Sequence, residues 1–505
     1  MMATLKTFGG AALAALLGST AAFADVTAQE VWDDWKAQME IYGDGAVTVG
    51  SETMKGETLT VEDITVRFAD EEAVVTAEIG PILLTTNEDG TVSVELPGES
   101  PVTIETNPVY GEPVEMQLTF TQEAAMMTVS GDPDAMTYDL VAASYGIRVD
   151  DISDSGEVNL NAAEATLSNI EATYSSVTNG QLRNLDYDFS AESLSANVDA
   201  EEPGGPGLFK FSGAIDALRT NASIVVPVEM DMDAPESAFV DGLSFEGGYS
   251  FGSNSYVFEL NEGENRETSG AVTASGGELS IAMSSAGFSF SGGATEPSLE
   301  LSSYDLPFPV SVSAAEYAYG ISVPLAAGDA PQPFGLSLLL DRLAIGEPLW
   351  GMIDPAASLP HDPATVRLDL TGMVNPRYDV LDPSQMPQMM SDDLPADLTE
   401  LSLNDLTVSV AGAELIGSGS FTFDSSDLET FQGFPAPTGE LTVRLTGANT
   451  LIDKLVEMGL LPQEPAMGAR MMMGMFAKPV GDDQLETKLE ITGDGQIIAN
   501  GQRIQ

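Results

Sequence analysis

Two stretches of this sequence decide its fold, because apolar and polar side chains alternate in them with a period of two residues. Residues 366–370 read VRLDL, and residues 441–445 read LTVRL. Such alternation places apolar side chains on one face of an extended strand and polar side chains on the other. Each stretch therefore predicts a β-strand with one apolar and one solvent-facing side.

The same alternation continues, with interruptions, through most of the chain. Residues 59–68 read LTVEDITVRF, in which the apolar phase slips by one residue between Val61 and Ile64, and residues 401–410 contain a similar slip. A slip of this kind predicts a β-bulge. Turns rich in Gly, Asn and Asp, such as residues 87–90, separate the alternating segments. The pattern predicts a mainly β protein with one or more large curved antiparallel sheets of many short strands.

Helical spacing occurs near both ends of the chain. Residues 27–30 read TAQE, which has the form of a capping box, and apolar residues follow at helical spacing as far as Gly43. This pattern predicts one N-terminal helix over about 27–42. Residues 449–477 contain two apolar runs at helical spacing and predict a helical hairpin before a last strand near 485–491.

The first 24 residues have the pattern of a secretory signal peptide. Lys6 supplies a positive charge, residues 8–17 form a short apolar run, and Ala22 and Ala24 form a small-x-small cleavage site before Asp25. We expect cleavage between Ala24 and Asp25, and export of the mature chain to the periplasm or beyond.

Two stretches rich in Pro and Gly, residues 201–207 and 328–333, are candidate boundaries. The resulting division is a signal peptide at 1–24, a helix and β region at 25–200, a middle β region at 208–330, and a C-terminal β region with the helical hairpin at 334–505. One continuous sheet crossed by both loops is the alternative.

Composition excludes several classes of function. The 505 residues include 79 Asp and Glu against 18 Lys and Arg, a formal net charge of -61. Nucleic-acid binding needs a cationic face, so we expect no nucleic-acid partner. The chain has no Cys and one His, which removes disulfides, thiolate nucleophiles and Cys-ligated metals. No later apolar run is long enough to predict a transmembrane segment in the mature chain, and we expect no cofactor.

One motif points to an enzyme. Residues 248–252 read GYSFG, which matches a nucleophile elbow around Ser250, and Asp354 and His361 would complete the serine-acid-histidine order of an α/β-hydrolase. The elbow requires a helix after the serine, whereas residues 253–260 have the pattern of another strand. An exported serine hydrolase is therefore the third hypothesis, and we assign no catalytic, metal-binding or cofactor-binding residue.

Methionine is frequent, with 22 residues, and gathers on the predicted C-terminal hairpin. Thioether clusters can bind Cu(I), but methionines on an amphipathic helix more often fill a core or form an adaptable apolar surface. We interpret one set of residues as a lid for an apolar ligand: Met467, Met471, Met472, Met475 and Phe476.

Several short stretches carry a family resemblance. They are residues 350–355 (WGMIDP), 359–365 (LPHDPAT), 439–447 (GELTVRLTG) and 459–461 (GLL). Over about 336–505 the chain resembles a domain-of-unknown-function family of secreted, β-rich alphaproteobacterial proteins, which implies no assigned activity. Residues 403–423 also resemble repeats of AsmA-like envelope proteins. That likeness implies a long curved sheet with an apolar inner face and a connection to lipid traffic.

Two non-enzymatic functions follow. The first hypothesis is a periplasmic envelope protein that binds lipid or another hydrophobic ligand in a groove of its sheet. The second is a structural or protein-interaction module of the envelope, in which the sheet binds no ligand. Lipid extracted from the purified protein would distinguish the two.

Overall fold

The structure is a computed structural model of the chain. It describes residues 25–40, 46–69, 73–106, 113–153, 159–228, 237–263, 266–328, 330–385, 387 and 396–504. Ala22 and Ala24 of the predicted signal peptide lie outside the described residues.

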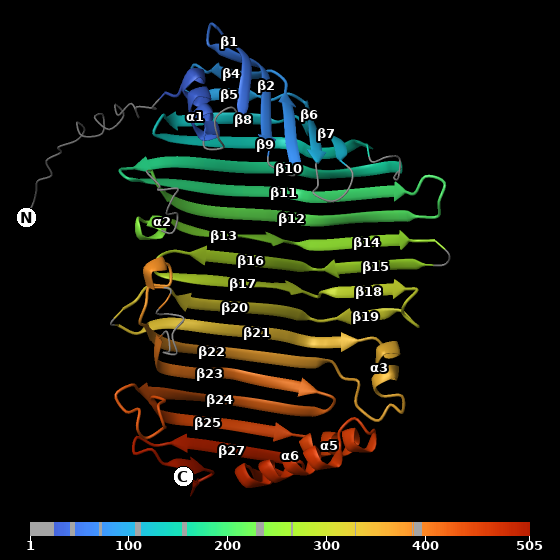
Figure 1. Ribbon diagram of the computed structural model, residues 1–505, viewed down its shortest axis with the longest axis vertical. Coiled ribbons are helices and arrows are strands. Elements are labelled where there is room, and N and C mark those ends of the chain that lie inside the picture. The colour runs from blue at the N-terminus through green and yellow to red at the C-terminus, as the bar shows by residue number, and fades with distance from the viewer. Residues whose placement is uncertain are drawn as a thin grey trace, which may run out of the picture.

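The described residues form one antiparallel sheet of 29 strands, as the composition and alternation predicted. Figure 1 shows the strands stacked in nearly sequential order from the N-terminal to the C-terminal end. The first eight strands are β1 (Val47–Lys55), β2 (Thr58–Ala69), β3 (Ala73–Ile79), β4 (Ile82–Thr86), β5 (Val92–Glu95), β6 (Glu99–Thr106), β7 (Val114–Glu123) and β8 (Met126–Asp132). Four long strands follow: β9 (Ala135–Ser153), β10 (Asn159–Asn179), β11 (Leu182–Glu201) and β12 (Leu208–Pro227).

The middle and C-terminal parts of the sheet continue this stack. The middle strands are β13 (Ser244–Phe251), β14 (Ser253–Asn261), β15 (Glu267–Ala274), β16 (Gly276–Met283), β17 (Gly287–Thr295), β18 (Ser298–Ser303), β19 (Val310–Ser313) and β20 (Glu316–Pro324). The C-terminal strands are β21 (Gln332–Ile345), β22 (Ala364–Pro376), β23 (Ala396–Val410), β24 (Ala413–Asp424), β25 (Ala436–Thr446), β26 (Lys478–Gly481), β27 (Gln484–Ile491), β28 (Ile497–Ala499) and β29 (Gln502–Arg503).

Many of the short strands are halves of longer ones. β13 and β14 lie end to end beside the single long strand β12, and three further pairs, β16 with β15, β17 with β18, and β20 with β19, repeat this arrangement (Figure 1). The breaks between the halves fall at or next to Gly252, Ser275, Glu296 and Ala315, so they form a line across the sheet. We call this line the crease.

The crease also passes through the long strands, where a residue with positive φ takes the place of a break. Asn169 of β10, Ala217 of β12 and Arg342 of β21 have φ values of 48°, 53° and 50°. One left-handed residue shifts the phase of alternation by one position. Leu167 and Ile170, on either side of Asn169, consequently lie in one hydrophobic cluster on the same face. Both halves of each strand therefore present their apolar side chains to one side.

The two slips seen in the sequence have different structures. At residues 61–64 of β2, Asp63 has a φ of 55° and the register with β1 is unchanged, so the slip is a kink that belongs to the crease rather than a bulge. In β23 the register with β24 shifts between Leu403 and Leu406, as a β-bulge requires. The kink in β2 and the bulge in β23 both keep the apolar residues of their strand on one face.

Helices occupy the predicted places near the two ends. They are α1 (Ala28–Glu40), α5 (Ala448–Glu457) and α6 (Gln463–Phe476). The capping box forms at the start of α1, where the Glu30 carboxylate accepts a hydrogen bond of 2.9 Å from the Thr27 backbone N–H. Two short helices were not predicted, α2 (Ser237–Val240) and α3 (Glu347–Ile353), because four and seven residues are too few to show helical periodicity.

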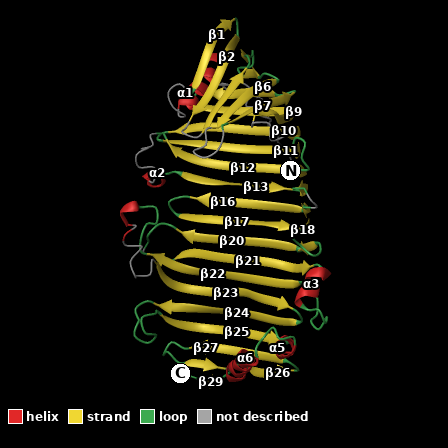
Figure 2. Ribbon diagram, turned by 45° about the vertical axis from the view of Figure 1, so that its right-hand side comes forward, coloured by secondary structure: helices red, strands yellow, loops and turns green. Residues whose placement is uncertain are grey.

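The two candidate boundaries lie in loops between paired strands. The loop at 202–207 joins β11 to β12, which pair along their whole length, and the loop near 325–331 joins β20 to β21. Hydrogen-bonded pairing therefore continues across both loops in one sheet. In the view turned by 45°, the ladder of strands is unbroken from β9 to β27 (Figure 2).

We predict that the left-handed residue at the crease is required for stability. Replacing Asn169 by Val should lower the free energy of unfolding by about 1–3 kcal/mol, because a β-branched side chain is strained at positive φ. Asn169→Gly should be nearly neutral. The matched control is Glu171→Val on the same strand, which is exposed and outside the positive-φ set. Urea unfolding measures the difference, and equal midpoints for Asn169→Val and Glu171→Val would refute the role of the crease.

We also predict that salt stabilises the protein. The polar face carries rows of acids, among them Asp139, Asp188 and Glu171, and the 79 acids far outnumber the 18 basic residues. Their mutual repulsion is screened as the Debye length falls from about 10 Å at 0.1 M to about 3 Å at 1 M. The melting temperature should rise as NaCl increases from tens of millimolar. A melting temperature independent of NaCl would mean that repulsion does not limit stability.

Candidate functional site

One face of the sheet is apolar across almost its whole length. Cross-strand neighbours connect one residue per strand into a row that runs from β9 to β27 and contains no charged side chain: Tyr138, Tyr174, Tyr187, Ala222, Gly247, Ile281, Phe290, Ile321, Leu336, Leu370, Leu403, Gly419, Leu441 and Leu489. The next row on this face has the same character: Leu140, Ala172, Phe189, Thr220, Tyr249, Leu279, Gly292, Tyr319, Leu338, Leu368 and Leu406. We call this face the trough.

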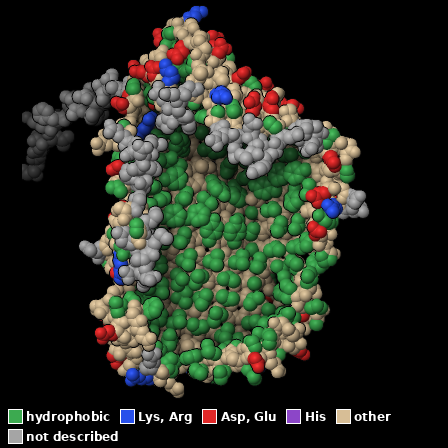
Figure 3. Space-filling view, viewed as in Figure 1, with side chains coloured by type: hydrophobic (Ala, Val, Ile, Leu, Met, Phe, Trp, Pro, Cys, Tyr) green, Lys and Arg blue, Asp and Glu red, His purple; other side chains and the backbone are tan. Residues whose placement is uncertain are grey.

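The row between these two points to the opposite face and is polar. It consists of Asp139, Thr173, Asp188, Asn221, Gly248, Ser280, Ser291, Gly320, Ser337 and Asp369. The alternation seen in the sequence therefore separates two whole surfaces of the molecule. Figure 3 shows the trough as a broad hollowed surface of hydrophobic side chains, with the charged side chains at its rim.

The middle of the trough is not covered by another described element. Six of its large side chains keep 40–45% of their surface exposed: Tyr187, Tyr249, Tyr317, Ile321, Leu336 and Leu338. Thirteen strand-to-strand steps of about 4.8 Å separate β9 from β27, so the trough extends over about 60 Å. Contiguous exposed apolar patches on soluble proteins rarely exceed a few hundred Å² and mark binding surfaces when they do.

Glycines make parts of the trough floor flat. A Cβ on Gly277 would lie 2.4 Å from the ring of Phe251 on the neighbouring strand, and a Cβ on Gly372 would lie 2.4 Å from the ring of Phe334. The ring of Phe251 therefore lies over Gly277, and the ring of Phe334 lies over Gly372. This packing leaves a smooth apolar floor at these positions.

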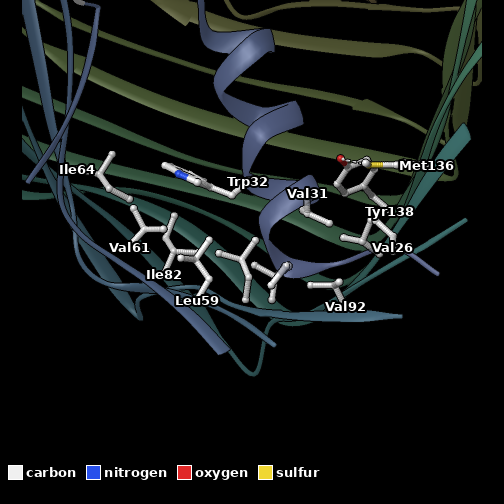
Figure 4. Close-up of a cluster of buried hydrophobic side chains, with 14 residues drawn as sticks. Val26, Val31, Trp32, Leu59, Val61, Ile64, Ile82, Val92, Met136 and Tyr138 are labelled. Atoms are coloured by element: carbon white, nitrogen blue, oxygen red, sulfur yellow. Dashed lines mark hydrogen bonds between the residues drawn. The ribbon is translucent and has the colours of Figure 1, made fainter. Parts of the chain in front are cut away.

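Helix α1 closes the N-terminal end of the trough. Its residues Val31 and Trp32 are fully buried and pack against Leu59, Val61 and other residues of β2, β4, β5 and β8, as Figure 4 shows. The Thr27–Glu30 box and a hydrogen bond of 2.9 Å from the Ala28 backbone N–H to Thr86 Oγ1 fix the start of the helix. The helix thus acts as an apolar plug at this end.

A polar contact attaches the plug to the trough. Tyr138 Oη donates a 2.8 Å hydrogen bond to the Asp34 carboxylate of α1, and Arg183 lies 3.5 Å from the same carboxylate. Burial and the negative charge of Asp34 raise the pKa of Tyr138, so the phenol stays protonated and remains a donor. Beside this contact, Tyr138, Tyr174 and Tyr187 stack with ring centroids 5.5 and 4.7 Å apart, which leads from the plug into the trough.

A cavity of about 550 Å³ lies between α1 and the adjoining strands. Its wall includes Trp32 and Trp35 of α1 and a mostly apolar set of residues from the sheet and the β5–β6 connection: Ile64, Val66, Ala77, Ile79, Ile82, Leu96, Pro97, Ser100, Val102, Phe120, Thr121, Gln122 and Tyr145. We call it the chamber. Phe120 pairs with Ile147 and Tyr145 with Leu167, both on the apolar face, so the wall of the chamber continues into the trough.

The predicted lid lies at the opposite end of the molecule. Met467, Met471, Met472 and Met475 of α6 each have 59–67% of their surface exposed, whereas Phe476 is half-buried. The Asp483 carboxylate, just before β27, accepts hydrogen bonds of 2.9 and 2.7 Å from the backbone N–H and hydroxyl of Thr450 and thereby holds the start of α5. The helical pair consequently sits at the C-terminal end of the sheet in both ribbon views, and not across the trough. The methionines form an exposed apolar stripe there.

The residues of the hydrolase motif do not come together. Ser250 lies inside β13, with β14 immediately after it and no helix at that point. His361 precedes β22, and four strands separate β13 from β22. His361 instead stacks on Trp350, with ring centroids 4.3 Å apart, and its Nε2 lies 3.7 Å from the buried carboxylate of Asp354.

Asp354 has a structural role in this loop. Its carboxylate accepts a 2.6 Å hydrogen bond from the Leu359 backbone N–H, and the hydrogen bonds from Leu359 and Ser358 lower the pKa of Asp354. The residues 350–363 that carry the family resemblance thus fold α3 and its loop onto each other. Among the described residues, no three His, Asp or Glu side chains gather closely enough to hold a metal ion.

Sequence reasoning identified Trp32 as an apolar position of the first helix but not the chamber that it lines. The chamber is formed by residues from α1, from six strands and from the β5–β6 connection, between positions 32 and 145, and no local pattern in the sequence predicts such a cavity. The sequence contains only a weak indication of the trough, because its aromatic residues occur at alternating positions within the predicted strands.

Comparisons with known proteins identify one family. None of the helices in the described part of the chain has the length and apolar character that crossing a membrane requires. Neither the curated proteins nor the solved structures include a match to this chain. The sequence model of a family described as "Uncharacterized protein conserved in bacteria (DUF2125)" matches residues 258–500, from within β14 to just past β28. The matched residues 258–500 build most of the trough and both C-terminal helices, but neither α1 nor the chamber.

Proposed function

We propose that this protein is a non-enzymatic lipid-binding protein of the bacterial periplasm, and that the trough is its binding site. The observation that carries the proposal is the apolar face itself, which has uncharged rows over about 60 Å and large side chains left 40–45% exposed. Burial of apolar surface contributes roughly 25 cal/mol per Å², so covering these side chains is strongly favourable.

Lipid chains fit this surface better than a compact ligand does. A small-molecule site encloses its ligand and provides a few convergent polar groups. The trough is instead long and open, and its floor consists of aliphatic side chains, aromatic rings and glycines. Hydrocarbon chains make non-directional contacts and can extend along such a floor.

The location in the periplasm rests on the sequence of the first 24 residues. Lys6, the apolar run and the Ala22-x-Ala24 site favour export by a signal peptide. The large excess of acids suits a protein that stays soluble while it exposes an apolar face, because net charge of one sign opposes self-association.

We predict that mutations in the trough remove bound lipid. The double variant Ile321→Asp/Leu336→Asp places two carboxylates on adjacent strands of the floor, where burial under a hydrocarbon chain is costly. Solvent extraction and mass spectrometry should find at least tenfold less lipid per protein than in the wild type. Ile416→Asp is the matched control, since Ile416 is also 43% exposed but lies on the opposite face, paired with Thr407 and Arg444.

The same measurements test the alternative of a protein-interaction module. A wild-type protein that carries no lipid, and that binds neither vesicle lipid nor an apolar fluorescent probe, would overturn the lipid proposal. Retention of lipid by the trough variant would place the site elsewhere. The control variant should match the wild type in lipid content and in its circular dichroism spectrum.

We predict that the exported chain begins at Asp25. N-terminal sequencing of protein from the periplasmic fraction should read Asp-Val-Thr-Ala, and Ala24→Leu should leave uncleaved precursor, because the cleavage site requires a small residue. A cytoplasmic protein that retains Met1 would contradict the proposed location.

A further inference from the structure

The indole N–H of Trp32 lacks a hydrogen-bond partner among the described residues, although the side chain is fully buried. Buried polar groups in folded proteins nearly always have a partner, and each exception requires an explanation. One polar group of α1 therefore has no partner within the described protein.

Trp32 is part of the wall of the chamber. Figure 4 shows its indole ring extending from α1 toward Ile64 of β2, which is another wall residue. Indole nitrogen can only donate a hydrogen bond. The unpartnered group therefore requires an acceptor. Its nitrogen has no exposed surface in this structure, so an acceptor in the chamber reaches it when a side chain of the wall shifts.

The walls restrict the charge of that acceptor. The chamber is lined by no charged side chain, and its amide Gln122 is already occupied, since Nε2 donates to Leu96 O at 3.1 Å and Oε1 accepts from the Ala125 backbone N–H at 3.0 Å. An ionised carboxylate or phosphate would be buried here without a counter-charge, which is strongly unfavourable. A neutral carbonyl oxygen attached to hydrocarbon satisfies both the donor and the apolar wall.

We propose that the chamber holds an acyl chain of an ester-linked lipid, and that the ester carbonyl accepts a hydrogen bond from Trp32 Nε1. This proposal rests on the proposed function, because the rest of the lipid extends from the chamber into the trough past Phe120 and Tyr145. It deepens that function by selecting acyl esters over ether-linked or purely hydrocarbon ligands.

The test compares two lipids that differ only in the linkage. Dioleoyl phosphatidylethanolamine and its ether-linked analogue displace an apolar fluorescent probe from the wild type, from Trp32→Phe and from Trp35→Phe. The net worth of one such hydrogen bond corresponds to about a two- to tenfold difference in affinity. We expect the wild type and Trp35→Phe to prefer the ester by this factor, and Trp32→Phe to bind both lipids equally. Trp35→Phe is the matched control, since it removes the same ring volume from the same chamber.

Each other result has a definite meaning. Equal binding of ester and ether by the wild type would overturn the carbonyl contact and leave the proposed function intact. An ester preference that persists in Trp32→Phe would overturn it as well. Failure of both lipids to bind the wild type would overturn the proposed function itself.

A second measurement does not depend on the folding of Trp32→Phe. The chain contains three tryptophans, so Trp35→Phe/Trp350→Phe leaves Trp32 as the only one. An ester lipid brominated along its acyl chain should quench this fluorescence, because bromine quenches on contact. Unchanged emission on saturation with the brominated lipid would show that the chain does not enter the chamber.

Discussion

The phase of side-chain alternation across the crease is the constraint on which the other features depend. A strand of about 20 residues must place every second side chain on one face, and any slip moves the remaining apolar residues to the other face. In β10 the left-handed residue Asn169 compensates for such a slip, so that Leu167 and Ile170 lie on the same side. The aligned breaks at Gly252 and Ser275 do the same for the divided strands. These positive-φ residues and strand breaks are aligned across the sheet. Because of this alignment the molecule has one apolar face, and not two faces that each mix apolar and polar side chains.

This separation explains how so acidic a chain forms an ordered sheet. The polar face carries the acids, where water and salt reduce their repulsion, and the trough carries none in its central rows. Most of the ion pairs are exposed, as for Arg367 with Asp405, and exposed pairs contribute little to stability. The sheet is held together instead by its backbone ladder and by the apolar packing on one side. The fully buried cluster around Trp32 and Leu59 is therefore concentrated where α1 covers that side.

Local patterns predicted the elements well, because a period of two or of 3.6 residues is a property of neighbours in sequence. The strand at 441–445 and the capping box at Thr27 and Glu30 are examples. The crease could not be predicted, because a slip in one strand does not reveal whether the slips in its neighbours fall beside it. The position of the methionine helix was also beyond local patterns, since Asp483, 33 residues after Thr450, holds the helical pair at the end of the sheet. Helical spacing predicted that Met467, Met471 and Met475 share one face of a helix but not that this face is exposed.

The two ends of the trough differ in a way that bears on the proposed lipid binding. At the C-terminal end, the family region of residues 258–500 provides the floor and an exposed methionine stripe. At the N-terminal end, α1 and the first strands add the partly open chamber and one unpartnered donor beside it. An open apolar floor binds chains without regard to their position, because dispersion and the hydrophobic effect are non-directional. A buried donor fixes one atom of the ligand, because a hydrogen bond requires defined geometry. In the proposed lipid complex, the residues before position 258 would therefore add what the trough alone lacks, a fixed position for one end of the acyl chain.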